Sequence, residues 1–322
     1  MLDAKNLRGE LESVVEQLRH RGFELEVEKW TRFESLRRKL QIKTEELQAQ
    51  RNKKSKEIGI AKAKGIESKD LFDSVQNISG SLKELSLDLE TVQTELKEFL
   101  LGLPNIPDPS VPSGNSEDEN MVLRLEGFIP EFDFKIKDHV EIGENLGQID
   151  FESATKLSGS RFVVLKGDIA RLQRGLIQFM LDLHVAEHKY QEVYVPFLVN
   201  EDTMRGTGQL PKFSEDLFAI GLHELFLIPT AEVPVTGLMR DKIVEKEELP
   251  LKFVCHSPCF RSEAGSYGKD TRGMIRQHQF EKVELVQIVS PDASQKTLEQ
   301  LTSNAEVVLQ RLELPYRVVE LC

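Results

Sequence analysis

The chain has 322 residues, of which 39% are hydrophobic and 30% are charged, and its formal net charge is −12. This length allows two domains and a full hydrophobic core. The acidic balance excludes indiscriminate attraction to nucleic acid, so binding to a polynucleotide would need a local basic strip. Three cysteines form no disulfide framework and indicate a reducing compartment. No apolar run has the length of a signal sequence or a membrane span, so we expect a cytoplasmic protein with no membrane partner.

The first hundred residues predict a helical arm. Residues 1–24 are typical of a short amphipathic helical start, and residues 26–63 form a charged run with no proline. Gly65 breaks this run, and a second run extends to residue 101. Its apolar residues recur at steps of four and three, which is the seam of a coiled coil: Leu71, Val75, Ile78, Leu82, Leu85, Leu89, Val92, Leu96 and Phe99. Two such helices predict an antiparallel hairpin about 45–55 Å long at 1.5 Å per residue.

Charge divides unevenly between the two helices of this arm. Residues 28–64 hold twelve basic and five acidic side chains, whereas residues 67–100 hold three basic and eight acidic ones. The opposite charges could pair across the hairpin and otherwise stay solvated. Alternatively, the basic strip could follow a phosphate backbone by charge and shape, without reading bases. Both interpretations can hold for different residues.

A proline-rich segment separates the arm from the rest of the chain. Four prolines lie between residues 104 and 112, which cannot continue a helix, and an acidic run follows at residues 117–119. Beyond it the heptads give way to short strands and helices. The sequence therefore predicts a helical arm at 1–102, a proline-rich and acidic linker at 103–119 and a second domain at 120–322.

The second domain opens with a helix, a strand and a turn that could carry polar chemistry. We expect a helix at 167–189 and a strand at 192–199, in which Pro196 indicates an edge or a contact with another chain. The glycine-rich stretch at 206–213 lacks the spacing of a phosphate-binding loop. A short strand at 225–228 runs into Thr230-Ala231-Glu232, whose hydroxyl and carboxylate suit an ammonium group. The same three residues are also typical of a helix cap.

Residues 253–289 predict a β-hairpin with a long loop, and this hairpin organises the domain. Alternation along a strand would place Arg261 and Glu263 on one face, and Phe280 and Glu284 on one face of the return strand. Arginine offers a planar fork for phosphate and Phe280 offers a ring for a base. The loop adds Lys269, Arg272 and Arg276, which could close over a polyphosphate. The alternative is a solvated, charged hairpin without a ligand.

In this order, the arm, the Thr-Ala-Glu turn and the hairpin resemble the bacterial-type seryl-tRNA synthetases, which are class II aminoacyl-tRNA synthetases. The resemblance covers essentially the whole chain. Residues 260–263 with Gly273 and residues 279–284 are similar to the second signature motif of the class. The helix at 167–189 and the strand with Pro196 are similar to the first, dimer-forming motif. The resemblance implies an α+β fold, with a long antiparallel two-helix coiled-coil arm and a mixed, mainly antiparallel sheet flanked by helices.

The resemblance also implies a two-step reaction. Serine attacks the α-phosphate of ATP to give seryl-adenylate, and the seryl group passes to the 3′ end of tRNA(Ser), or of tRNA(Sec). The implied catalytic residues are Arg261, Glu263 and Arg272, and the implied ATP-binding residues are Arg261, Ser262, Glu263, Arg276 and Phe280. The implied serine-binding residues are Thr230, Ala231, Glu232, Arg261 and Glu284, and the implied tRNA-binding residues are Arg37, Arg38, Lys43, Arg51, Lys53 and Lys54. A homodimer through residues 167–200 is implied as well.

One departure from the family pattern concerns the carboxyl end. In the family the catalytic domain continues beyond the position of residue 322, and the third signature motif and the main glutamate that holds Mg²⁺ lie there. We therefore expect ATP and Mg²⁺ as cofactors, no metal ligand within these residues, and a truncated form with an incomplete sheet. The alternative function is a catalytically impaired synthetase fragment that still binds tRNA.

Overall fold

The computed structural model describes residues 2–67, 69–265 and 272–322. Lys269 of the predicted hairpin loop lies outside these residues. The described residues divide into two compact units. Unit 1 comprises Met1–Asn120 with Leu321–Cys322, and unit 2 comprises Met121–Glu320.

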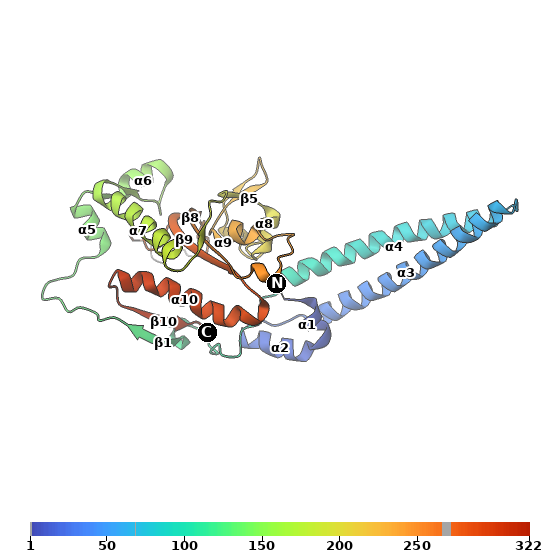
Figure 1. Cartoon of the computed structure of the whole chain (residues 1–322), viewed down its shortest axis with the longest axis horizontal. Coiled ribbons are helices and arrows are strands. Elements are labelled where there is room, and N and C mark those ends of the chain that lie inside the picture. Colours follow the sequence, from blue (N-terminus) through green and yellow to red (C-terminus); the bar gives the residue numbers. More distant parts are fainter. Residues whose placement is uncertain (1, 68, 266–271) are drawn as a thin grey trace. The chain divides into compact units, whose positions relative to one another are not determined.

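Unit 1 is built around the two predicted long helices (Figure 1). Its helices are α1 (Ala4–Gly9), α2 (Leu11–His20), α3 (Val27–Ala63), α4 (Lys69–Leu101) and the short 3-10 helix η1 (Glu117–Glu119). The long helices α3 and α4 pack along one another and form the hairpin. Leu82, Val92 and Leu96 are buried, and the other predicted seam positions are at least half-buried, so the predicted seam is confirmed.

A hydrophobic core fixes the base of the arm. Trp30 and Phe33 of α3 are buried, and the rings of Phe33 and Phe99 meet edge to face with their centroids 5.9 Å apart. Leu7 of α1 and Leu18 of α2 complete this core. The short amino-terminal helices therefore stabilise the end of the hairpin that is distant from its turn.

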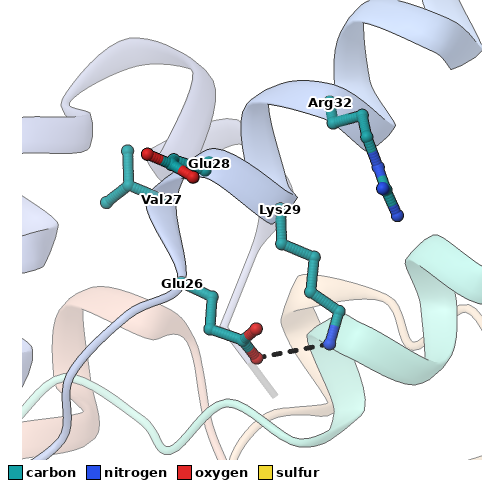
Figure 2. A pocket seen from close by; sticks show the side chains of 5 residues that line it. All are labelled: Glu26, Val27, Glu28, Lys29 and Arg32. Carbon is teal, nitrogen blue, oxygen red and sulfur yellow. Dashed lines mark hydrogen bonds and ion pairs between the residues drawn. The ribbon is translucent and has the colours of Figure 1, made fainter.

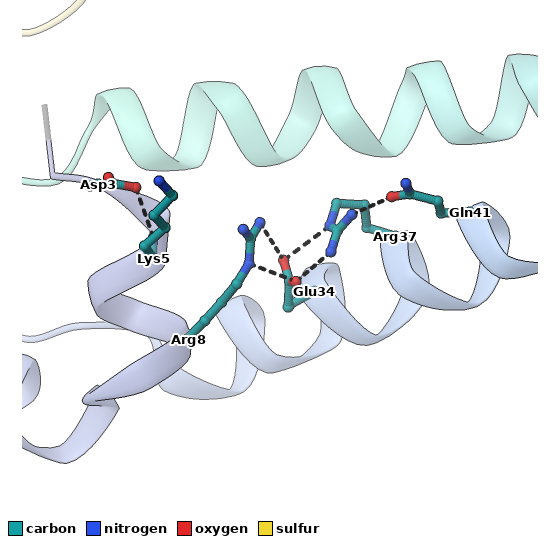
Figure 3. A network of polar contacts seen from close by, with 6 residues as sticks. All are labelled: Asp3, Lys5, Arg8, Glu34, Arg37 and Gln41. Carbon is teal, nitrogen blue, oxygen red and sulfur yellow. Dashed lines mark hydrogen bonds and ion pairs between the residues drawn. The ribbon is translucent and has the colours of Figure 1, made fainter.

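Two polar arrangements surround this core. Arg8 of α1 donates to Glu34 of α3 at 2.9 Å, and Arg37 donates to the same carboxylate at 2.6 Å (Figure 3). These two guanidinium groups hold the pKa of Glu34 below its ordinary value, with the Arg37 hydrogen bond as the largest cause. At the start of α3, Lys29 bonds Glu26 at 3.2 Å beside a surface pocket (Figure 2).

Within the residues that the structure describes, the strands of unit 2 form four small sheets. Its strands are β1 (Met121–Glu126), β2 (Ile149–Asp150), β3 (Val164–Leu165), β4 (Gln191–Glu192), β5 (Leu198–Asn200), β6 (Ala219–Ile220), β7 (Leu225–Leu227), β8 (Leu251–Phe260), β9 (Gln279–Ile288) and β10 (Tyr316–Glu320). They pair as β1-β10, β2-β3, β4-β8-β9 and β5-β7-β6. Only β4 and β8 run parallel among these described pairs, so the predicted mixed, mainly antiparallel arrangement is confirmed.

Helices cover both faces of the β4-β8-β9 sheet. The helices of unit 2 are α5 (His139–Asn145), α6 (Phe151–Ser158), α7 (Gly167–Ala186), α8 (Glu201–Gly206), α9 (Glu232–Gly237) and α10 (Ser294–Arg311), with 3-10 turns at Ser214–Asp216, Lys246–Glu248 and Pro291–Ala293. Leu181 of α7 packs on Val254 at one face. Val235 of α9 and Ala231 pack on Cys255 at the opposite face. The predicted helix, α7, and the predicted hairpin, β8-β9, thus lie at the centre of one layered core.

Two local predictions are wrong. The strand expected at 192–199 is split into β4 and β5, because Pro196 has no N–H with which to continue a ladder. Arg261 and Glu263 do not share a strand face, because β8 ends at Phe260 and Glu263 has a positive φ of 54°. Both residues belong to the loop that follows the strand.

Among the described residues, no helix combines the length and the apolar character needed to cross a membrane.

Candidate active site

The register of the β8-β9 hairpin places small side chains opposite long ones. Cys255 pairs with Glu284, Ser257 with Lys282, and Cys259 with Phe280. The three β8 residues have no exposed surface, and burial raises the pKa of the Cys255 thiol to about 11. These cysteines are therefore inert packing residues, and their small volume leaves room above the sheet for the β9 side chains.

Thr230, Lys282 and Glu284 meet in a closed triangle of hydrogen bonds. The Thr230 hydroxyl donates to Glu284 Oε2 at 2.6 Å and accepts from Lys282 Nζ at 2.8 Å. Lys282 Nζ also lies 2.8 Å from Glu284 Oε2. Hydrogen bonds to charged groups are short and strong, so this triangle fixes all three side chains. The Thr-Ala-Glu turn and the return strand of the hairpin, β9, thus contact one another.

Glu232 lies at the first position of α9, next to this triangle. Its backbone N–H donates to Thr230 Oγ1 at 3.3 Å, so the Thr230 hydroxyl also contacts the start of this helix, although the N-cap residue itself is Ala231. The residue as a whole is exposed. Partial desolvation of the carboxylate raises the pKa of Glu232, and the nearby Glu284 raises it further while Lys282 lowers it. The carboxylate would therefore gain from a ligand with a positive charge.

Arg261 is held at one end and open at the other. Its Nε donates to the carbonyl of Pro229 at 3.2 Å, and its guanidinium carbon lies 5.1 Å from the centre of the Phe280 ring. Within the described part of the chain, its two terminal nitrogens have no hydrogen-bond partner. A guanidinium fixed by stacking and one hydrogen bond, with its fork available, suits a phosphate or a carboxylate.

A pocket of about 340 Å³ lies in front of this fork. It is lined by Gln209, Phe213, Asp216, Leu217, Pro229, Thr230, Arg261, Glu263 and Arg276. Arg276 and Glu263 pair across it at 2.8 Å, and Asp216 accepts from the backbone N–H of Ala264 at 2.9 Å. Ser262 bonds backbone oxygens of Glu215 and Asp216, so it holds the loop instead of facing the pocket with its hydroxyl.

Arg272 stands apart from these groups. Its guanidinium lies 3.3 Å from Asp138, the residue that caps α5, and it is largely exposed. The adjacent Gly273 has a φ of +81° and packs against His139, where a Cβ atom would lie 2.2 Å from the ring. Only glycine fits this contact. The loop exit is therefore attached to α5, and Arg272 is not gathered with Arg261.

The predicted tRNA-binding residues all lie on α3 but differ in their surroundings. Arg37 is engaged by Glu34 and Gln41, and the ion pair with Glu34 raises its pKa (Figure 3). Arg38 and Lys43 line a shallow surface pocket of about 480 Å³ along the helix. Arg51, Lys53 and Lys54 are exposed or half-exposed nearer the hairpin turn. Arg38 and Lys43 are thus freer than Arg37 to meet a polyanion.

The sequence interpretation missed several residues of the site. Lys282 is two positions before Glu284 and therefore on the same strand face, so the alternation rule could have identified it. Gln209, Phe213 and Asp216 come from a stretch that lacks any phosphate-loop spacing, and only the fold brings them to Arg261.

The residues that the structure describes contain no group of three or more His, Cys, Asp or Glu side chains placed to hold a metal ion. Glu263, which lines the pocket, is paired with Arg276, and Glu284 is paired with Lys282.

Comparison with known protein families gives two matches. The family model for the seryl-tRNA synthetase N-terminal domain matches residues 1–107. The model for the tRNA synthetase class II core domain (G, H, P, S and T) matches residues 218–322. The two matches cover the long helices and the hairpin site respectively.

Individual relatives match over the whole chain. The serine–tRNA ligase of Methylococcus capsulatus is 57% identical over 100% of this chain and 76% of its own length. That of Hahella chejuensis is 54% identical with the same coverage. Among solved structures, seryl-tRNA synthetase from Pyrococcus horikoshii complexed with ATP has a TM-score of 0.88 at 35% identity, covering 99% of this chain and 76% of that one. Cytoplasmic serine–tRNA ligase from Naegleria fowleri in complex with AMP has a TM-score of 0.82 at 28% identity, covering 97% and 75%.

Proposed function

The chain belongs to the serine–tRNA ligase family, and from that premise we propose that it activates L-serine with ATP and transfers the seryl group to the 3′ end of tRNA(Ser). The observation that carries the proposal is the polar triangle of Thr230, Lys282 and Glu284 beside the open fork of Arg261. An amino acid and a nucleotide phosphate must meet for adenylate formation. These two features offer a binding group for each, the triangle from the Thr-Ala-Glu turn and β9, and the fork from the loop that follows β8.

In the first step, a carboxylate oxygen of serine attacks the α-phosphorus of ATP and pyrophosphate leaves. The charge that develops on the α-phosphate oxygens needs a positioned cation more than a strong base. Arg261 is suited to this role because Pro229 and Phe280 fix its guanidinium group and the residue lines the pocket. Phe280 would also stack with the adenine base.

Other loop residues would contact the nucleotide around this centre. Glu263 and Arg276 neutralise one another across the pocket and would reach the adenine end and the polyphosphate, respectively. Ser262 would fix the backbone of the same loop. Arg272 would have to exchange its pairing with Asp138 for the polyphosphate, and its exposure makes this exchange inexpensive.

The serine subsite would be formed by Thr230, Ala231, Glu232, Arg261 and Glu284. Ala231 is fully buried and sets the turn from which the flanking side chains project. Two carboxylates and a hydroxyl suit the ammonium and the hydroxyl of serine. A pocket that hydrogen-bonds the substrate hydroxyl rejects alanine strongly, because the missing hydroxyl would leave polar groups without a partner.

In the second step, the 3′-terminal ribose hydroxyl of tRNA attacks the carbonyl carbon of seryl-adenylate, and AMP leaves.

The binding of tRNA and the chemistry are assigned to two domains: an arm at 1–102 binds tRNA, a linker follows at 103–119, and the catalytic domain is at 120–322. The basic face of α3 would contact phosphates in the long variable arm of tRNA(Ser). Arg38 and Lys43 are its more available members, and the other basic residues of this face are Arg37, Arg51, Lys53 and Lys54. Charging of tRNA(Sec) with serine would use the same face.

A homodimer through residues 167–200 is part of the proposal. Four large hydrophobic side chains of this region are exposed in the single chain, and they support a contact with a second copy: Leu172, Val185, Tyr194 and Leu198. A cytoplasmic location accords with the supply of aminoacyl-tRNA to ribosomes.

Mg²⁺ would enter with the ATP phosphates, and no protein ligand for it is assigned among the described residues.

The test is serine-dependent exchange of labelled pyrophosphate into ATP. We expect exchange with serine and much less with alanine or threonine. Exchange that is independent of serine would contradict the proposal. If the chain binds tRNA(Ser) but shows no pyrophosphate exchange, the result would instead favour the alternative function, a tRNA-binding synthetase fragment without ligase activity.

A further inference from the structure

We infer that Lys282 is a specificity-determining residue of the proposed serine pocket, and that it assigns different ligand groups to its two carboxylates. By neutralising Glu284, Lys282 makes that carboxylate an acceptor for the uncharged hydroxyl of the substrate. Glu232 is thereby left as the carboxylate for the ammonium group. This inference rests on the proposed function and adds Lys282 to the residues of the proposed serine subsite.

The first support is geometric. Lys282 Nζ lies 2.8 Å from both Thr230 Oγ1 and Glu284 Oε2, and these two oxygens are themselves 2.6 Å apart. One ammonium group therefore bridges a hydroxyl and a carboxylate that are already bonded to one another. Thr230 is buried, whereas Lys282 and Glu284 keep 32% and 20% of their side-chain surface. The triangle is thus rigid but still reached from the ligand side.

The second support is the contrast with Glu232. Within the described residues, the Glu232 carboxylate has no ion pair and no side-chain hydrogen bond. Its neighbours Glu284 and Lys282 act on it through space in opposite directions, the first raising and the second lowering its pKa. Of the two carboxylates, only Glu284 has a cation in direct contact. Glu232 is therefore the one whose charge is available for an incoming ammonium.

This distribution of charge explains a preference for a hydroxyl over an amine at the substrate side chain. A second ammonium placed near Glu284 would meet the ammonium of Lys282 and be repelled, whereas a hydroxyl can donate to Glu284 and accept from Lys282. Without Lys282, the carboxylate of Glu284 would be free to pair with a cation. Removal of the lysine should therefore change which ligand is preferred.

The experiment measures binding of serine and of 2,3-diaminopropionate, the analogue with an amine in place of the hydroxyl. Ligand-observed NMR titrations of the whole chain give both affinities. In the unmodified protein we expect serine to be preferred. In Lys282→Met we expect the ratio of the two affinities to move toward the diamino acid by about tenfold or more, since a charge-assisted hydrogen bond replaces a repulsion. Lys282→Arg keeps the charge and should keep the preference for serine.

Matched controls separate this role from a structural one. Lys252→Met removes a lysine of the same sheet that lies over the Tyr190 ring, and it should leave the ratio unchanged. A loss of both ligands in equal proportion in Lys282→Met, with far-UV circular dichroism unchanged, would overturn the inference and leave the proposed function intact. An unmodified chain that binds no serine, with or without ATP, would overturn the proposed function and this inference with it.

Discussion

Replacement of Thr230 by valine tests the polar triangle directly, because it removes one hydroxyl and keeps the shape of the side chain. The hydroxyl donates to Glu284 at 2.6 Å and accepts from Lys282 at 2.8 Å, and the residue is 4% exposed. A hydrogen bond to a charged group contributes about 1.5–3 kcal/mol. Since Lys282 and Glu284 still hold one another after the change, no unpaired charge remains in the site. We therefore expect the free energy of unfolding to fall by an amount near the lower end of this range, about 2 kcal/mol.

Urea unfolding followed by far-UV circular dichroism measures this cost, and thermal unfolding gives a second estimate. For a unit of about two hundred residues, a loss of about 2 kcal/mol lowers Tm by roughly 4–8 °C. Thr302→Val is the matched control, because its hydroxyl bonds only the Leu298 carbonyl within α10 among the described residues, and its loss should be nearly neutral. Serine binding should weaken in Thr230→Val and not in the control. A free energy of unfolding that changes by less than about 0.5 kcal/mol in Thr230→Val would refute the assignment of Thr230 to a strong network.

Three further predictions concern other parts of the account. Glu232→Gln should weaken serine binding by about tenfold to a hundredfold, because it removes a charged acceptor for the ammonium. Burial and Glu284 raise the pKa of Glu232, so in the unmodified protein the ionised form, and serine binding with it, should be lost as the pH falls through that raised pKa. NMR titrations from about pH 8 to about pH 4 should show this loss in the unmodified chain and not in Glu232→Gln. Phe33→Ala should destabilise the base of the arm by about 3–5 kcal/mol, because Phe33 is 6% exposed and packs on Phe99. The single tryptophan, Trp30, lies in the same core and reports unfolding by fluorescence. An unchanged urea midpoint would contradict this packing. Joint replacement of Arg38 and Lys43 by glutamine should reduce the slope of log affinity for tRNA against log salt concentration by about 2. Arg37→Gln should change this slope less, because Glu34 already engages the Arg37 guanidinium. Equal slopes for the variants and the unmodified chain in filter binding would count against the basic strip.

The sequence predicted most where one physical signal dominates. The apolar residues from Leu71 to Phe99 recur at helical spacing, and burial of one face is the main source of stability for a long helix pair, so the arm was predictable in detail. Two β-rich runs with a glycine-containing loop likewise predicted the β8-β9 hairpin. Its strict alternation then brought Phe280 and Glu284 to one face, as expected.

The sequence predicted less where tertiary context decides. Strand alternation predicts one shared face for Arg261 and Glu263, but the chain leaves the ladder after Phe260 and Glu263 has a left-handed backbone conformation. The contribution of Asp216 to the pocket depends on a loop that meets residue 264 from a distance of 48 positions in the chain. No local pattern encodes such a contact. Arg272 was grouped with Arg276 by proximity in sequence, yet the close packing of Gly273 on His139 carries it to α5.

The most direct test of the central claim is the formation of seryl-tRNA. Labelled serine, ATP and tRNA(Ser) are incubated with the chain, and acid-precipitable label at the 3′ end of the tRNA is measured over time. The account predicts label that requires ATP, that is lost in Arg261→Ala and that is much lower with a tRNA lacking the long variable arm. Full charging by Arg261→Ala, or equal charging of tRNAs with and without that arm, would contradict it.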